Sequence, residues 1–410
     1  MTFKKNMEKM ENQNTSNTAA IARPAFNFSY DPILLIAIIM LLCWGMVMVA
    51  SASIAMAERE LGQPFYYLQR QALFALLGVI AAICITRMPL AWWQESARAS
   101  LLAALLLLCL VLIPGIGQSV NGARRWLSLG IFGFQVSELV KLIMIIYTAS
   151  YIVRYAEQVR TQFIGFLKPI AVITLVAALL LLEPDFGAVV VIACITLGML
   201  FLAGVKWRHF ILLLTLAIGA LATLIFIAPY RMRRLTSFID PWADQFNSGY
   251  QLTQALIAFG RGEWFGAGLG QSVQKLFYLP EAHTDFIFAV LGEELGLIGA
   301  LLFLALYLLM LWRAFSTAQA AQKQQQWFGA YVAYGITIWF AVQALISIGV
   351  NMGILPTKGL TLPFISYGGS SLLVTLMAVG FLLRVNIETN SISATKRARG
   401  QEIPGHKLRE

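Results

Sequence analysis

Residues Ile33–Ile54 read ILLIAIIMLLCWGMVMVASASI, a run without a charged side chain that is long enough to cross a lipid bilayer as a helix. Nine further apolar runs follow it along the 410-residue chain. The chain is 59% hydrophobic and only 12% charged, whereas a soluble domain has about 25% charged residues. This composition excludes a soluble domain and a disordered chain, and the continuous runs exclude a β-barrel, whose strands are short and alternating. The sequence predicts an all-α polytopic membrane protein.

We expect about ten transmembrane helices, with both termini in the cytoplasm because Lys and Arg concentrate on the side of the N-terminus. The predicted spans are 33–54, 69–86, 97–114, 137–154, 164–182, 186–204, 208–229, 285–312, 328–350 and 366–386. A cytoplasmic N-terminal tail occupies 1–30 and the membrane domain 31–387. A basic, disordered cytoplasmic tail is predicted for 388–410, and a long outside loop, 230–284, joins helices seven and eight.

The cysteines, histidines and net charge exclude several kinds of site. All four cysteines lie inside apolar runs and the three histidines are scattered, so their spacing indicates no metal site. With this hydropathy, the net charge of +10 favours anionic lipid headgroups over nucleic acid as a partner. The Gly266-x-Gly268-x-Gly270 run has no surrounding βαβ pattern, and no organic cofactor is expected.

Two outside segments are long and polar: Pro114–Gln135 and Tyr230–Thr284. Arginine on this side opposes the positive-inside bias and therefore needs a reason. Arg231 and Arg234 either bind a phosphate ligand, which arginine contacts through two hydrogen bonds, or anchor to lipid headgroups or a nearby aspartate. Glu183 and Asp185, in an outer turn, serve either the turn itself or an ion network. Composition leaves these alternatives open.

Asp285 lies where the large outside loop meets the eighth span. It either caps the helix N-terminus, a position that Asp favours, or acts as a general base that takes a proton from a sugar hydroxyl. Glu293 and Glu294 lie deeper in the same span on different faces, so at least one should be structural. Lys358 is the only charge in the connection before the tenth span, and it either extends to the lipid headgroups or contacts an anion.

Seven motifs, in order across residues 30–388, resemble those of the SEDS family of membrane cell-wall polymerases. They are VNGARRW (Val120–Trp126), SELVK (Ser137–Lys141), EPDFG (Glu183–Gly187), PYRMRR (Pro229–Arg234), SGYQLTQALIAFGRGEWFGAGLGQSVQKL (Ser248–Leu276), LPEAHTDFIFAVLGEELG (Leu279–Gly296) and LPTKGLTLPFISYGGSS (Leu355–Ser371). The last motif is most like the family's division members. The resemblance implies a peptidoglycan glycosyltransferase that polymerises lipid II on the periplasmic face of the bacterial inner membrane, at the division septum.

The resemblance also implies roles for single residues. Asp285 would be the catalytic base on the acceptor's sugar hydroxyl, in an inverting reaction that releases undecaprenyl pyrophosphate. The substrate contacts that the resemblance implies are Arg125, Lys141, Glu281 and Lys358, and the phosphate interpretation of the outside arginines adds Arg231 and Arg234. Undecaprenyl-linked glycan, membrane lipids, a class B penicillin-binding transpeptidase and other divisome proteins would be partners, and a divalent cation (Mg²⁺ or Mn²⁺) a cofactor. A lipid II flippase and a non-catalytic scaffold that recruits the transpeptidase stay open as alternatives.

Overall fold

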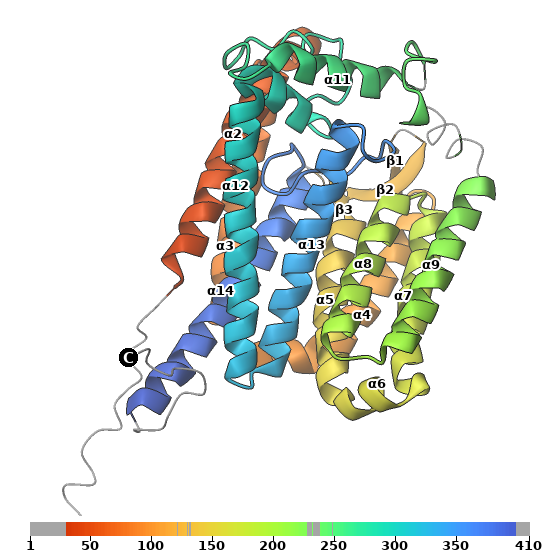
Figure 1. The fold of residues 1–410 in the computed structure, drawn as a ribbon, viewed down its shortest axis with the longest axis vertical. Helices are drawn as coiled ribbons and strands as arrows, with labels where there is room; N and C mark the ends of the chain where they lie inside the picture. The colour runs from red at the N-terminus through yellow and green to blue at the C-terminus, as the bar shows by residue number, and fades with distance from the viewer. Residues whose placement is uncertain are drawn as a thin grey trace, which may run out of the picture.

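The computed structural model describes residues 30–398 apart from 121, 129, 131–132, 228–231, 233–237 and 248. Figure 1 shows the long helices gathered side by side into one bundle. Helix α11 (Tyr250–Gly262) lies across one end of it, which we call the outer end, and the short helix α6 (Ala156–Thr161) lies at the opposite, inner end. The predicted polytopic helical architecture is confirmed.

The bundle helices follow the predicted apolar runs closely. They are α2 (Pro32–Leu61), α3 (Tyr66–Arg87), α4 (Leu90–Leu112), α5 (Val136–Arg154), α7 (Phe163–Leu182), α8 (Phe186–Leu202), α9 (Trp207–Ile227), α12 (Ile287–Lys323), α13 (Trp327–Asn351) and α14 (Gly369–Ala398). Within the described residues, eight helices are long and apolar enough to cross a membrane. Helix α8 and the Trp207–Leu216 part of α9 are apolar but shorter, so the number of spans stays a prediction.

Helices α5, α13 and α14 form the centre of the bundle. Buried residues make up 78%, 67% and 78% of their most apolar windows, against 28–39% for α2, α3, α4, α7 and α12. The outer helices therefore turn a broad apolar surface toward lipid, while the central ones pack on all sides, with Trp339 and Phe340 of α13 fully buried. Figure 1 shows the connection from α13 to α14 lying inside the outer half of the bundle, beside the small sheet.

A three-stranded antiparallel sheet occupies the outside segment Pro114–Gln135, for which no regular structure was expected. Its strands are β1 (Gly117–Val120), β2 (Ala123–Ser128) and β3 (Gly133–Gln135), in the order β1-β2-β3. The amide of Gln135 donates to Ser370 Oγ at 3.0 Å, so the sheet is tied to the start of α14.

Helix α12 changes direction at Gly296, whose φ of 66° and ψ of −168° lie outside the helical region. The loop after α11 fills the break: the amides of Ala267 and Gly268 donate to the carbonyls of Glu293 and Glu294 at 2.9 and 3.0 Å. A Cβ on Gly296 would lie 2.4 Å from the amide nitrogen of Gly266, so a glycine is required there. The loop thus replaces the backbone hydrogen bonds that the break removes.

Glu293 and Glu294 are both structural. Glu293 accepts from the amide of Val273 at 2.9 Å and from Arg261 at 3.3 Å. Glu294, also fully buried, lies 2.6 Å from Lys275 Nζ and accepts from Ser51 of α2 at 2.7 Å. The expectation that at least one of them is structural is confirmed, and together they hold the outer loop onto α12 and α2.

The inner end is held by a similar ion pair. Asp31 caps α2 by accepting from the amides of Ile33 and Leu34, and the guanidinium of Arg313 in α12 donates to its other carboxylate oxygen. Helix α14 continues through Ala398, ten residues beyond the predicted start of a disordered tail at 388. The first turn of this extension carries an Arg384–Glu388 pair at 2.8 Å, which supports the helix where its apolar residues end.

Glu183 lies in the connection between α7 and α8, fully buried, and neither carboxylate oxygen has a hydrogen-bond partner in the described part of the chain. Burial, reinforced by the negative charge of Asp185 and opposed by Arg125, raises its pKa from 4.5 to about 8. Asp185 instead caps α8, accepting from the amide of Ala188 at 3.1 Å and from Ser137 Oγ at 2.8 Å. Glu183 is therefore a neutral acid at pH 7.

We expect Glu294→Leu to lower the free energy of unfolding by about 3–5 kcal/mol, because it leaves the Lys275 ammonium buried without its counter-charge. Thermal unfolding of the purified protein in detergent measures the loss. The double variant Glu294→Leu/Lys275→Met removes both charges and should recover most of it. Equal losses of unfolding free energy in the single and double variants would show that the unpaired Lys275 charge is not the cause of the loss.

We expect the free energy of unfolding of the wild type to fall as pH rises from 4.5 to 8. The variant Glu183→Gln, which cannot titrate at this position, should lack this part of the fall. The folded protein keeps a proton on Glu183 up to a pKa of about 8, whereas the unfolded chain releases it near 4.5. The native state therefore binds more protons in this window and loses stability with increasing pH. Melting temperatures of both proteins across pH 5–8 test this, and parallel curves would refute it.

Candidate functional site

A cavity of about 1080 Å³ opens at the outer end of the bundle. This volume exceeds the range of about 300–1,000 Å³ usual for small-molecule sites, so it has room for a saccharide headgroup. Its walls come from α3, the sheet, the start of α8, the loop before α12 and the connection from α13 to α14. Side chains that combine charge and aromatic surface line it: Tyr67, Arg70, Arg125, Trp126, Asp185, Glu281, His283, Asp285, Lys358 and Tyr367.

Asp285 is half-buried in the wall of this cavity, and its backbone is held from one side. Three consecutive carbonyls accept hydrogen bonds from the α13–α14 region: His283 from the amide of Tyr367 at 2.9 Å, Thr284 from Ser366 Oγ at 2.7 Å, and Asp285 from Asn351 Nδ2 at 2.8 Å. Each donor is more than 60 residues away in sequence. The position of the Asp285 carboxylate is therefore fixed by the fold rather than by its own loop.

Asn351 is the most informative of these donors. It is fully buried at the end of α13, and its Oδ1 also accepts from the amide of Ala289 in the first turn of α12 at 3.0 Å. One amide side chain thus satisfies both a carbonyl and an amide at the start of α12. The sequence contains one signal for it, a strongly polar residue at the end of an apolar run.

The helix-capping alternative for Asp285 is excluded. Helix α12 begins at Ile287, its cap position is Phe286, and no side chain caps it. A Cβ on Gly359 would come within 3.0 Å of Asp285 Oδ2, so that glycine leaves space for the carboxylate. The Asp285 carboxylate therefore lies at the cavity wall beside Gly359 and not at the cap position of α12.

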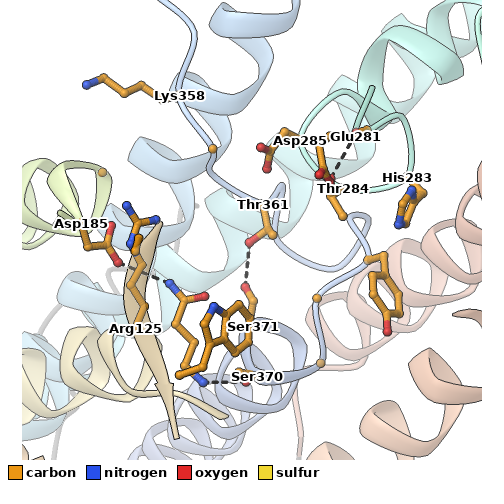
Figure 2. Close-up of a pocket in the computed structure, with 18 of the residues that line it drawn as sticks. Arg125, Asp185, Glu281, His283, Thr284, Asp285, Lys358, Thr361, Ser370 and Ser371 are labelled. Atoms are coloured by element: carbon orange, nitrogen blue, oxygen red, sulfur yellow. Dashed lines mark hydrogen bonds between the residues drawn. The ribbon is translucent and has the colours of Figure 1, made fainter. Parts of the chain in front are cut away.

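Two predicted cationic contacts lie across the cavity from Asp285. Figure 2 shows Arg125 and Lys358 on one side and Asp285, Glu281 and His283 on the other. Arg125 extends from β2 and donates through Nε to the carbonyl of Glu183 at 3.1 Å and through Nη2 to that of Pro184 at 2.5 Å. Both bonds orient its guanidinium. Lys358 Nζ lies 3.8 Å from the centre of the Phe186 ring.

Of two other predicted substrate contacts, Glu281 lines the cavity and Lys141 does not. Glu281 lines the cavity and accepts from Thr284 Oγ1 at 2.6 Å. The expectation for Lys141 needs correction, because its side chain does not line the cavity: it is fully buried, 2.8 Å from Glu138 and 2.8 Å from Gln343 Oε1. Gln343 in turn donates to the carbonyl of Thr361, a lining residue. Lys141 thus supports the wall from behind.

Arg231 and Arg234 lie outside the residues that the structure describes. Among those residues no group of three or more His, Cys, Asp or Glu side chains is placed to hold a metal ion. Glu281, on the loop before α12, is a hard oxygen donor in the cavity wall. Magnesium is often held by one or two carboxylates together with substrate phosphates, so the donor set fits a metal shared with a pyrophosphate.

An aromatic wall, which the sequence analysis did not identify, stands beside Asp285. The ring of His283 lies 4.6 Å from that of Tyr67 and 5.6 Å from that of Tyr367, measured between centroids. Burial lowers the pKa of His283, so its ring is neutral at pH 7. Its Nδ1 is buried and has no hydrogen-bond partner among the described residues. The sequence signal was present in the AHTD stretch, but spacing alone could not bring α3 to it.

Sequence comparison shows which proteins share these features. The profile described as "Cell cycle protein" of FtsW, RodA and SpoVE matches residues 32–391. A relative from Thioalkalivibrio sulfidiphilus, named as a probable peptidoglycan glycosyltransferase FtsW, is 57% identical over 87% of this chain and 89% of its own. A protein of the same name from Nitrosococcus halophilus is 56% identical over 90% of this chain and 95% of its own.

Solved structures are similar to this chain over most of its length. A chain from a peptidoglycan synthase complex that coordinates polymerization and crosslinking superposes with a TM-score of 0.73 at 29% identity, over 88% of this chain and 98% of its own. The rod-shape-determining protein RodA of Thermus thermophilus gives a TM-score of 0.65 at 28% identity, over 87% and 97% of the two chains. On the match to 32–391 and these identities, the chain belongs to the FtsW/RodA/SpoVE family, which is the SEDS family, and relatives 56–57% identical to it are named FtsW.

Proposed function

We propose that this protein is a peptidoglycan glycosyltransferase that polymerises lipid II into glycan strands, with Asp285 as the general base. The observation that carries the proposal is a carboxylate at the wall of a large outer cavity, on a loop whose backbone carbonyls accept three long-range hydrogen bonds, with Arg125 and Lys358 on the opposite side. The names of the 50–57% identical relatives support the same activity.

The reaction joins two lipid-linked saccharides. Asp285 accepts the proton of the acceptor's sugar 4-hydroxyl, whose oxygen attacks the anomeric carbon of the donor from the face opposite the leaving group. The bond from that carbon to the pyrophosphate oxygen breaks, and the configuration inverts. Undecaprenyl pyrophosphate leaves with increased negative charge, which Arg125 and Lys358 stabilise electrostatically. Both lipids stay anchored in the outer leaflet while their headgroups occupy the cavity.

The aromatic wall has a role in this scheme. The rings of Tyr67, His283 and Tyr367 present an apolar surface beside Asp285, and a sugar ring has an apolar face of C–H groups that packs on such a surface. The wall would orient the acceptor hydroxyl toward the carboxylate.

A divalent cation, Mg²⁺ or Mn²⁺, fits the same cavity. When bound, it would neutralise pyrophosphate charge, with Glu281 as an oxygen donor from the cavity wall, while Asp285 keeps the role of the base. Polymerisation assays in EDTA and in Mg²⁺ test this. Equal rates in the two conditions would contradict a metal requirement.

We place the protein in the bacterial inner membrane at the division septum, with a class B penicillin-binding transpeptidase as its partner. The similarity to a chain from a peptidoglycan synthase complex supports a transpeptidase partner. The 57% identity to a protein named FtsW supports the division role. A lipid II flippase and a non-catalytic scaffold are the alternatives, and neither needs a base at Asp285.

We expect Asp285→Asn to reduce lipid II polymerisation by about 10²–10⁴-fold, the usual contribution of a general base, while lipid II binding is retained. Gel analysis of glycan strands, with the transpeptidase partner present, measures the rate. Asp240→Asn makes the same chemical change in the outer loop, at an exposed aspartate outside the cavity lining, and should leave the rate unchanged. Full-length strands from Asp285→Asn at the wild-type rate would refute Asp285 as the base.

We expect Asn351→Leu, which keeps the side-chain volume, to lower kcat by about 100-fold with little change in KM. The variant loses the bonds that position Asp285 and the start of α12 but alters no residue that lines the cavity. Steady-state kinetics on the folded fraction separate the two constants. A raised KM with unchanged kcat would show that Asn351 shapes substrate binding instead of positioning the base.

A further inference from the structure

A second cavity, of about 350 Å³, lies between α4, α5 and α7 near the inner end of the bundle. Arg98, Arg154 and Lys168 line it together with Tyr147, Tyr151 and Tyr155, and its lining contains no carboxylate. Helix α5 runs from the sheet at the outer end to Arg154 at the inner end, and Figure 1 shows α6 following it there. The cavity is thus at the end of the bundle opposite the proposed catalytic cavity, at the leaflet that the Lys and Arg distribution makes cytoplasmic.

None of the three cations forms an ion pair with a carboxylate among the described residues. Arg154 is the last residue of α5, where the helix dipole favours a cation. Arg98 and Lys168 lie in the N-terminal halves of α4 and α7, where the helix dipole does not stabilise a cation. Three convergent positive charges in one hollow therefore indicate an anionic ligand.

The tyrosines show how the cavity is organised. Successive rings of Tyr147, Tyr151 and Tyr155 lie 6.3 and 5.0 Å apart along one face of α5. Tyr155 accepts from Arg98 Nη2 at 3.3 Å, and its ring centre lies 5.6 Å from Lys168 Nζ. Tyr151 donates to the carbonyl of Gly165 at 2.6 Å and so connects α5 to α7.

The polarity of the cavity changes with depth. The cations occupy its rim, and Tyr147 lies seven residues before Arg154, about 10 Å farther into the bilayer on a helix. Ala171 and Val172 complete the deep wall on α7. A phosphate fits the rim, because arginine contacts its oxygens through paired hydrogen bonds. The apolar deep wall, in contrast, can pack against an acyl chain but makes no favourable contact with a free anion.

We propose that this cavity binds the headgroup of an anionic phospholipid of the cytoplasmic leaflet, with its phosphate between Arg98, Arg154 and Lys168 and the start of an acyl chain along the tyrosine row. Occupancy would connect α4, α5 and α7 through one phosphate. The site is independent of the proposed glycosyltransferase activity.

Native mass spectrometry of the detergent-purified protein tests the proposal, with dioleoyl phosphatidylglycerol, dioleoyl phosphatidylcholine and glycerol phosphate as probes. We expect the protein to retain the anionic lipid at least about tenfold better than the zwitterionic one. The triple variant Arg98→Gln/Arg154→Gln/Lys168→Gln should lose this preference. The matched control Lys206→Gln/Arg208→Gln/Lys323→Gln removes the same charge at exposed positions outside the cavity and should keep it.

Ala171→Trp fills the apolar part of the cavity without changing its charge and should also reduce lipid retention, which keeps the test decisive if the triple variant does not fold. Equal losses in the triple variant and its control, or equal retention of the two lipids, would overturn the proposal. Displacement of the lipid by glycerol phosphate at equal concentration would overturn the assignment to a lipid and indicate a site for free phosphate.

Discussion

Three hydrogen bonds to consecutive backbone carbonyls, those of His283, Thr284 and Asp285, determine where the proposed catalytic carboxylate lies. The loop before α12 has no regular structure of its own, and without these bonds its carbonyls would need water or would be left unpaired at a membrane-embedded site. The donors come from the end of α13 and from the connection to α14. The proposed active site is therefore a product of the packing of α12, α13 and α14, and it should be lost whenever that packing is disturbed.

Ion pairs hold segments of the bundle together, because the hydrophobic effect that stabilises a soluble core contributes little between helices in lipid. In lipid, apolar side chains gain little by contacting each other instead of acyl chains, and helices associate through close packing and polar contacts. Lys275–Glu294 joins the outer loop to α12, Arg313–Asp31 joins α12 to α2, and Lys141–Glu138 stands behind the cavity wall. Removing one member of such a pair leaves a charge in a low dielectric, which is why these positions matter although they touch no substrate.

Much of the fold could be predicted from the sequence because long apolar runs report directly on helices in a bilayer. The ends of α3, α5 and α7 fall within about three residues of their predicted limits. Asp285, Glu281, Arg125 and Lys358 were found because the motifs mark them, and all four line the cavity.

The sequence could not predict which distant segments are in contact. The burial of Lys141, the bonds of Asn351 and the meeting of Tyr67 with His283 each depend on which helices are neighbours, and hydrophobic periodicity carries no such information. The sheet and the turn at Gly296 were missed for the same reason, since each is stabilised by partners far away in the chain.

Chemical rescue of a truncated base tests the central claim most directly. Asp285→Gly removes the carboxylate and opens space for a small carboxylate from solution, so lipid II polymerisation should be nearly absent in buffer and should rise with formate concentration. Asn351→Leu, which keeps the carboxylate but disturbs its position, should show no such dependence. Polymerisation by Asp285→Gly at the wild-type rate without formate would contradict the account.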